Sequence, residues 1–405
     1  MNRQQLNKQQ WSDWINPTVQ SFPSSGIRKF FDMATEVKDV ISLGVGEPDF
    51  VTPWHIREAS IYSLEKGYTM YTSNQGLSEL REAIARDLDT TYGVTYDARR
   101  ELLITVGVSE GMDLALRALL FPGDEVLIPE PSYVSYGPCV VMAGGVPVYM
   151  QTSVEDDFRL TAERVEASIT SRTKALLLCY PNNPTGAVMN RRELVAISEL
   201  VKQHNLIVFS DEIYDKLTYD GEHTCFSSLP GMRERTVLLN GFSKAYAMTG
   251  WRVGYVAGNA DFIGAMTKIH QYTMLCAPIM AQMAALEALK NGKDGMRRMV
   301  QEYNRRRHVV IQAFKDMGIS CFEPGGAFYA FPEIAPTGLT CEEFAEKLLL
   351  EEKVAVVPGN AFGPSGEGFI RCSYAASMED LMEAFRRMNR FVKRCGVKQK
   401  TVVNM

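Results

Sequence analysis

Short hydrophobic runs alternate with longer amphipathic stretches along the chain from about residue 100. The runs are rich in Val, Ile and Leu and cover residues 101–106, 125–130, 146–151, 174–180, 205–210 and 236–241. Continuous apolar runs are typical of strands whose two faces are both buried. The stretches between them, such as 109–120 with its Phe121-Pro122-Gly123-Asp124 ending, have the character of amphipathic helices. This alternation predicts an α/β fold with a mostly parallel sheet covered by helices.

The pattern changes after a long helical region near residues 260–292. A charged helix follows, then two stretches rich in glycine and aromatic residues, at 323–334 and 353–375, and a terminal helix. These features predict a smaller α+β unit, since a chain of 405 residues is too long for one simple core. We expect the two domains to share a cleft. The predicted boundaries are a large domain at 50–295, a small domain at 21–49 and 296–405, and an N-terminal arm at 1–20.

Charge and composition exclude several classes of function. The net charge is −5, so the chain has no excess of basic residues to neutralise a nucleic acid. No apolar run approaches the roughly 18 residues that a membrane span needs. The first 20 residues are polar and lack the apolar segment of a secretory signal. We therefore expect a protein that binds neither nucleic acid nor membrane.

The cysteines and histidines indicate the compartment and argue against a metal site. None of the eight cysteines forms a Cys-x-x-Cys pair, and most lie in apolar contexts. Buried free thiols in a reducing compartment explain this pattern better than disulfides or zinc, so we expect a cytoplasmic protein. The five histidines include no pair spaced to face one side of a helix. No metal is therefore expected.

Polar or aromatic clusters follow five of the hydrophobic runs, at the point where each run ends. They are Gly107-Val108-Ser109, Pro131-Ser132-Tyr133, Pro181 to Gly186, Asp211 to Tyr214, and Ser243-Lys244. In open α/β sheets, the carboxyl ends of the strands form the edge where ligands bind. Each cluster alone has a local explanation: a helix cap, a turn or a core residue. Five such clusters at one edge favour a ligand site.

The residue types at this edge define the ligand. A helix start bearing Ser109, with Arg252 close by, suits a phosphate. Asp211 would follow a buried strand, where a carboxylate is costly unless it meets a cation. Lys244 in a closed cleft would have its ammonium form disfavoured, which makes it a usable amine nucleophile. A phosphate, a protonated ring nitrogen and an aldehyde for a lysine together describe pyridoxal 5'-phosphate.

Several motifs carry a family resemblance over nearly the whole chain. They are SGIRKFFD, ISLGVGEPDF, YTSNQGLSELREAI, NNPTG, SDEIY, SKAYAMTGWRVGY, GGAFYAFP and FIRCSYA. With these motifs the chain resembles the fold-type-I, class I aminotransferases, especially the bacterial aspartate, alanine and aromatic aminotransferases. The resemblance implies a seven-stranded, mostly parallel sheet in the large domain, pyridoxal 5'-phosphate as the cofactor, and a homodimer.

The resemblance also implies roles for individual residues toward the cofactor. Lys244 would be the Schiff-base lysine and proton shuttle, Asp211 would pair with the pyridinium nitrogen, and Tyr133 would stack on the ring. Asn183 and Tyr214 would hydrogen-bond the phenolic oxygen. The residues expected to bind the phosphate are Val108, Ser109, Ser243, Arg252 and, from the neighbouring subunit, Tyr71.

The substrate would be held by a second set of residues. Arg371 would bind the α-carboxylate with two parallel hydrogen bonds, a geometry that lysine cannot copy. Gly46 would present its backbone to the same carboxylate, and Asn183 would contribute as well. We find no arginine to assign to a distal carboxylate, and Tyr133 replaces the tryptophan of some aspartate-specific enzymes. The amino donor therefore stays open among aspartate, alanine and aromatic amino acids.

The function that these observations favour is transamination between an L-amino acid and a 2-oxo acid, with 2-oxoglutarate as the expected acceptor and a ping-pong course. Two alternatives remain. One is a C–S β-lyase, which shares the lysine, the aspartate and the carboxylate-binding arginine. The other is a cofactor-binding regulatory module, although only about 40 polar residues precede the first long motif. A nicotinamide-binding dehydrogenase is disfavoured because no G-x-G-x-x-G follows the first strand.

Overall fold

A seven-stranded sheet forms the centre of the computed structural model, which describes residues 13–22 and 37–397 together with Trp11, Gly26, Met33 and Thr35. The strand order is β2-β8-β7-β6-β5-β3-β4. Only β8 runs antiparallel to its neighbours, β2 and β7. The predicted mostly parallel sheet is therefore confirmed. The strands are β2 (Leu102–Thr105), β3 (Glu125–Glu130), β4 (Val146–Gln151), β5 (Thr173–Leu178), β6 (Ile207–Asp211), β7 (Thr236–Gly241) and β8 (Gly254–Ala257).

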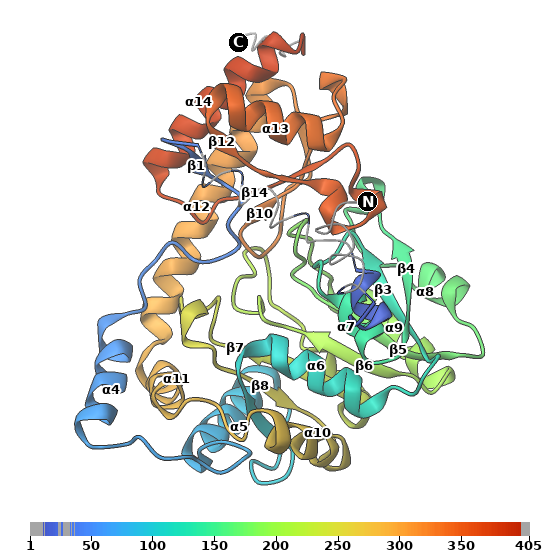
Figure 1. The fold of residues 1–405 in the computed structure, drawn as a ribbon, viewed down its shortest axis with the longest axis vertical. Coiled ribbons are helices and arrows are strands. Elements are labelled where there is room, and N and C mark those ends of the chain that lie inside the picture. The colour runs from blue at the N-terminus through green and yellow to red at the C-terminus, as the bar shows by residue number, and fades with distance from the viewer. Residues whose placement is uncertain are drawn as a thin grey trace.

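Helices cover both faces of this sheet, as the continuous apolar runs required (Figure 1). Along β2 and β7, neighbouring residues enter different hydrophobic clusters: Leu103 and Leu239 belong to one, Leu102 and Leu238 to the other. Successive strand side chains point to opposite faces, so each strand supplies both layers. One layer holds α6 (Gly107–Leu119), α7 (Tyr136–Met142) and α10 (Ala260–Thr273). The opposite face is covered by α4 (Trp54–Glu65), α5 (Ser78–Tyr92), α8 (Ala162–Ser168), α9 (Arg191–Gln203) and α11 (Ile279–Asn291).

A second unit packs above the carboxyl edge of the sheet and contains small sheets and several helices (Figure 1). Its long helix α12 (Lys293–Met317) runs up from the sheet region, with α13 (Cys341–Glu352) and α14 (Met378–Arg394) beside it. The strands are β1 (Ile41–Ser42), β9 (Ser320–Cys321), β10 (Tyr329–Ala330), β11 (Pro332–Glu333), β12 (Val354–Ala355), β13 (Val357–Pro358) and β14 (Ile370–Ser373).

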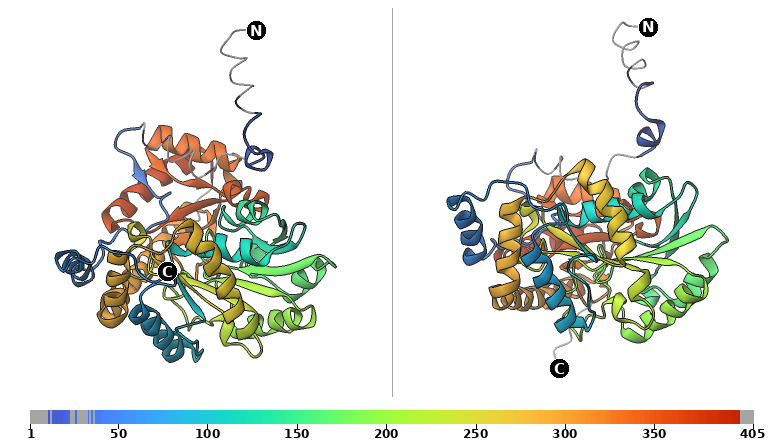
Figure 2. Two further views of the ribbon diagram at one scale, coloured as in Figure 1. Left: turned by 60° about the horizontal axis from the view of Figure 1, so that its bottom comes forward. Right: turned by 90° about the horizontal axis from the view of Figure 1, so that it is seen from below.

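The N-terminal part of the chain joins this second unit. Strand β1 pairs in parallel with β12, which brings residues before 50 against the C-terminal third of the chain. The domain boundaries themselves stay a prediction. The described residues leave out much of the predicted arm at 1–20 and much of the segment 21–49. They also leave out the last residues, 398–405. A short helix of the arm, α2 (Pro17–Gln20), is described and lies at the edge of the molecule, in contact with α7 (Figure 2).

Two findings concern the other classes of function considered above. In the part of the chain that the structure describes, no helix is long and apolar enough to cross a membrane. The same residues contain no group of three or more His, Cys, Asp or Glu side chains that could hold a metal ion. All eight cysteines are free thiols, and four of them are buried: Cys179, Cys225, Cys341 and Cys372.

Candidate active site

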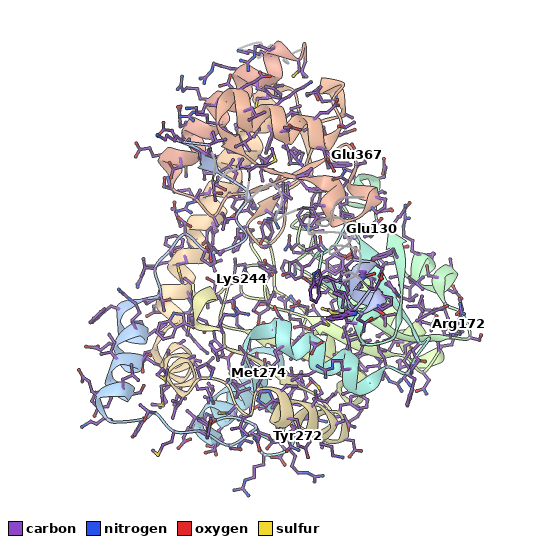
Figure 3. All side chains as sticks on the ribbon, in the orientation of Figure 1. Glu130, Arg172, Lys244, Tyr272, Met274 and Glu367 are labelled. Atoms are coloured by element: carbon purple, nitrogen blue, oxygen red, sulfur yellow. The ribbon has the colours of Figure 1, made fainter. Side chains whose placement is uncertain are left out.

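A cavity of about 750 Å³ lies between the carboxyl edge of the large sheet and the second unit. Lys244 marks its position between the two units in Figure 3. The cavity brings together nearly every site residue that the sequence suggested. They are Gly46, Val108, Ser109, Tyr133, Asn183, Asp211, Tyr214, Ser243, Lys244, Arg252 and Arg371.

Tyr71 is the exception, because it does not line this cavity. Its side chain is 81% exposed. Within one chain Tyr71 therefore makes no contribution to the cavity, and its role toward a neighbouring subunit stays a prediction.

Lys244 follows β7 and points its amine into the cavity. Its Nζ donates a hydrogen bond to the backbone oxygen of Gly46 at 2.6 Å. Burial lowers the pKa of Lys244 to about 8, and the nearby positive charge of Arg371 acts in the same direction. A large fraction of the side chain is consequently a neutral amine at mildly alkaline pH. That is the form in which a lysine attacks a carbonyl carbon.

Asp211 is the last residue of β6, and its carboxylate is buried. Oδ2 accepts a hydrogen bond from the Tyr136 hydroxyl at 2.8 Å, and Oδ1 accepts one from the Ile213 N–H at 3.2 Å. Burial raises the pKa of Asp211 to about 6 in spite of these two bonds. Within the described residues no Lys, Arg or His side chain forms an ion pair with it. A cationic group entering the cavity would meet a carboxylate whose charge is offset only in part, by the more distant Lys244.

The start of α6 forms a cup suited to an anion. The helix begins at Gly107, and among the described residues no side chain accepts a hydrogen bond from the N–H groups of 107–109, which also have no partner in the helix. Gly107 has a φ of +75°, and a Cβ there would lie 2.7 Å from an Arg252 nitrogen. Only glycine therefore lets the guanidinium approach the helix start. Together with the hydroxyls of Ser109 and Ser243, these groups fit a phosphate.

Arg371 lies on β14, lines the same cavity and is buried. It donates to Asn183 Oδ1 at 2.9 Å and to the Gly44 oxygen at 2.6 Å, while its Nε has no hydrogen-bond partner among the described residues. The guanidinium lies over the ring of Tyr329, 4.5 Å from its centroid. These contacts fix a buried cation at the cavity wall. Such a cation is suited to a carboxylate.

Gly46 makes room next to this cation. A Cβ at Gly46 would lie 2.8 Å from the Tyr329 hydroxyl and 3.8 Å from an Arg371 nitrogen. A larger residue at this position would therefore push into the Tyr329 hydroxyl and crowd the space in front of Arg371.

Two tyrosines of the cavity were missed by the sequence interpretation. Tyr136 donates to Asp211, and the Tyr329 hydroxyl lies 2.8 Å from the hydroxyl of Tyr214. Tyr136 follows Tyr133 by three residues at the start of α7, and this spacing was the one local signal for it. Tyr329 lies within the GGAFYAFP motif, where it could not be told from the neighbouring aromatic residues.

The chain is similar to a known enzyme family and to named enzymes of that family. The family model described as aminotransferase class I and II matches residues 38–388. The chain is 46% identical over 384 residues to an aspartate aminotransferase of Pyrococcus abyssi, covering 94% of this chain and 97% of that protein. It is 44% identical over 372 residues to the aromatic-amino-acid aminotransferase 2 of Thermococcus litoralis, covering 91% and 96%.

A solved structure is also similar to this chain. The aspartate aminotransferase of Thermus thermophilus with maleate is 38% identical to this chain. The alignment covers 93% of this chain and 99% of that one, with a TM-score of 0.88.

Proposed function

The chain belongs to the class I and II aminotransferases, and we propose that its cavity binds pyridoxal 5'-phosphate and exchanges amino groups between L-amino acids and 2-oxo acids in a ping-pong course. The observation that carries this proposal is the pairing of Lys244 with Asp211 in one cavity. A lysine whose pKa is lowered to about 8 faces the same space as a buried carboxylate that has no cationic partner among the described residues. An amine nucleophile and a buried carboxylate acceptor are what this cofactor's aldehyde and ring nitrogen require.

The residues present fit the cofactor from end to end. The α6 cup, Ser243 and Arg252 would hold the phosphate, Tyr133 would stack on the ring, and Asp211 would keep the ring nitrogen protonated. Tyr214 and Asn183 would hydrogen-bond the phenolic oxygen. When bound, pyridoxal 5'-phosphate supplies an aldehyde that takes up the amino group and a ring that withdraws electrons from the substrate Cα.

The chain's own groups then position the substrate and move its proton. Arg371 would bind the α-carboxylate, and Gly46 leaves space for it beside the Tyr329 hydroxyl. Lys244 Nζ would take the proton from the substrate Cα and deliver it to C4', the carbon that carries the cofactor's aldehyde. A pKa near 8 suits both steps, because a proton shuttle works best when its pKa is close to the working pH.

A homodimer belongs to the proposal because Tyr71 lies on an exposed apolar surface. Tyr71 is 81% exposed and Tyr272 is 85% exposed, with Met70 and Met274 also exposed. The two segments are joined, since the Asn74 side chain donates to the Leu275 oxygen at 2.8 Å. Figure 3 shows Tyr272 and Met274 at the end of the molecule opposite the second unit. A second copy seated there would cover apolar surface and bring its Tyr71 toward the cup.

The acceptor in our proposal is 2-oxoglutarate, and the donor is an aspartate, an alanine or an aromatic amino acid. The named relatives include both an aspartate and an aromatic aminotransferase. The cationic side chains that line the cavity within the described chain are Lys244, Arg252 and Arg371, each with a role assigned above. Any cation for a distal carboxylate would then come from the neighbouring subunit or from a part of this chain outside the described residues. This leaves dicarboxylic and aromatic donors to be separated by assay.

Two measurements test the function. The first is the absorbance of the loaded protein as single L-amino acids are added without an oxo acid. Conversion to a stable pyridoxamine spectrum is expected, and the fastest donor identifies the substrate. Release of pyruvate and ammonia from a sulfur amino acid, with the spectrum unchanged, would instead identify a lyase.

The second measurement is the turnover of Lys244→Ala. We expect loss of turnover by more than about 10³-fold, because the nucleophile and proton shuttle is gone. Cofactor capture should be partly retained, since the phosphate groups remain. Lys315→Ala, a change at an exposed lysine of α12, is the matched control and should keep full activity. Full activity of Lys244→Ala would refute the proposal.

A further inference from the structure

His270 is a completely buried histidine in the last turn of α10, outside the cavity. Its Nδ1 lies 2.7 Å from Glu110 Oε1. Its Nε2 is also buried, and it has no hydrogen-bond partner among the described residues. A buried histidine with one nitrogen unsatisfied is unfavourable by itself. The contact with Glu110 is thus the one hydrogen bond of this buried ring among the described residues, and its role is the question.

Glu110 connects this histidine to the phosphate cup. Its second oxygen, Oε2, accepts a hydrogen bond from the Val106 N–H at 2.5 Å. Val106 is the residue directly before α6, whose first residues, 107–109, form the cup. The carboxylate thus reaches back over the first helical turn and holds the backbone at the point where the strand becomes a helix.

The other side of the cup is fixed by packing. A Cβ at Gly254 would lie 2.8 Å from the backbone of both Gly107 and Val108, so β8 and the cup are in direct contact. The Thr105 hydroxyl donates to the Gly107 oxygen at 2.8 Å. The strand side therefore limits movement in one direction. The Glu110–His270 pair is placed to limit it from the helix side.

His270 also affects how the negative charge of Glu110 acts on an anion bound at the start of α6. A carboxylate in the first turn of a helix favours the helix, but it repels an anion bound at the same end. Donation from His270 Nδ1 holds Oε1 toward α10, and the Val106 N–H occupies Oε2. The N–H groups of 107–109 are left uncapped by any side chain of the described residues.

We propose that His270 is a positioning residue for cofactor binding: through Glu110 it holds the backbone N–H groups of the 107–109 cup in place for the phosphate. The inference rests on the function proposed above. His270 touches neither substrate nor cofactor in this assignment. It should therefore affect the affinity for a phosphorylated ligand much more than the rate of the loaded enzyme.

The experiment compares two variants and two ligands. His270→Phe fills the site without a donor, whereas His270→Asn is the matched control, because its amide N–H can replace Nδ1–H. Wild type and both variants are freed of cofactor, and the dissociation constants of pyridoxal 5'-phosphate and of unphosphorylated pyridoxal are measured by equilibrium dialysis.

For His270→Phe we expect the affinity for pyridoxal 5'-phosphate to fall by about tenfold, the usual size of a lost hydrogen bond to a charged group. The affinity for pyridoxal should stay within about twofold of wild type. His270→Asn should behave like wild type toward both ligands, and kcat at saturating cofactor should be unchanged in all three proteins. An equal loss for both ligands, or an equal loss in both variants, would overturn the inference in favour of simple packing.

Glu110→Ala tests the same link from its other end if His270→Phe fails to fold. It should also lose affinity selectively for pyridoxal 5'-phosphate, by less than His270→Phe because this variant removes the repulsive carboxylate as well. Adding His270→Phe to it should weaken phosphate binding no further, since the two residues act in series. Additive losses would contradict the inference. If wild type binds no pyridoxal 5'-phosphate at all, the proposed function fails; if wild type binds it and the variants show no selective loss, only this inference fails.

Discussion

Two neighbouring carboxylates at the end of β6, those of Asp211 and Glu212, have very different surroundings. Asp211 lines the large cavity, whereas the next residue, Glu212, lines a separate cavity of about 370 Å³. Glu212 is fully partnered: it accepts from Ser210 Oγ and from the Phe226 N–H, both at 2.9 Å, and its Oε2 lies 2.8 Å from His223 Nε2. Asp211 has hydrogen bonds but, within the described chain, no cationic partner.

Asp215 extends the contrast. It accepts a hydrogen bond from the Tyr92 hydroxyl at 2.6 Å, and Lys216 Nζ lies 3.4 Å from its Oδ2. Burial alone would raise its pKa, but the positive charges of Lys216 and His223, together with hydrogen bonds from Tyr92 and Asn240, outweigh burial and lower it. For Asp211, burial dominates and the pKa rises to about 6. A buried carboxylate with its own partners is structural, whereas one without a cation in the chain is prepared for a ligand.

The largest effect should follow from neutralising each of the two neighbouring carboxylates in turn. Asp211→Asn should lower kcat/KM by about 10³-fold, or about 4 kcal/mol, because the charge facing the cofactor ring is lost. Glu212→Gln is the matched control one residue away. It should reduce kcat/KM by less than about tenfold while lowering the free energy of unfolding by about 1–3 kcal/mol. Steady-state kinetics and chemical denaturation of both variants measure these two effects. Similar losses of kcat/KM in the two variants would contradict the different roles given to Asp211 and Glu212.

Asp215→Asn should have a smaller effect and act on stability. Removing this charge takes the nearest carboxylate from the buried Lys216 and leaves it Asp87 at 3.7 Å, and we expect the free energy of unfolding to fall by about 3 kcal/mol at pH 7. Because folding lowers the pKa of Asp215 from its usual 3.8, the stabilisation is present above that pH and is lost as the pH falls. The difference from wild type should therefore shrink toward pH 3.

Asp211→Asn in the cofactor-free protein should show the opposite sign. Folding raises the pKa of Asp211 from 3.8 to about 6, so the ionised group destabilises the fold, progressively as the pH rises from 3.8 through 6. At pH 7 the variant should be more stable than wild type by about 3 kcal/mol, and near pH 4 the two should be nearly equal. Urea denaturation at both pH values tests each sign. A loss of stability in Asp211→Asn at pH 7 would mean that Asp211 has a structural partner.

The sequence predicted the carboxyl-edge residues because they follow hydrophobic runs that fold as parallel strands. Asp211 ends β6 and Lys244 comes three residues after the end of β7, so the local pattern alone indicated that both lie at one edge. The partners of these residues were not predictable in the same way. The contacts of Asp211 with Tyr136 and of Glu110 with His270 join positions 75 and 160 residues apart. No periodicity links such pairs, since the packing of different elements decides them.

The smallest effect concerns the one hydroxyl that supports Asp211. Tyr136→Phe removes the hydrogen bond to Oδ2, which favours the ionised carboxylate, so the pKa of Asp211 should rise further. We expect kcat/KM to fall by about tenfold at pH 7, equal to about 1.4 kcal/mol, and the acidic limb of its pH profile to move to higher pH. Tyr133→Phe keeps a ring for stacking and is the control, expected within about twofold of wild type at every pH. An unshifted acidic limb in Tyr136→Phe would show that the ligand, and not this tyrosine, sets the charge of Asp211. The difference between Asp211 and Glu212 would then come only from the lack of an ion-pair partner for Asp211 among the described residues.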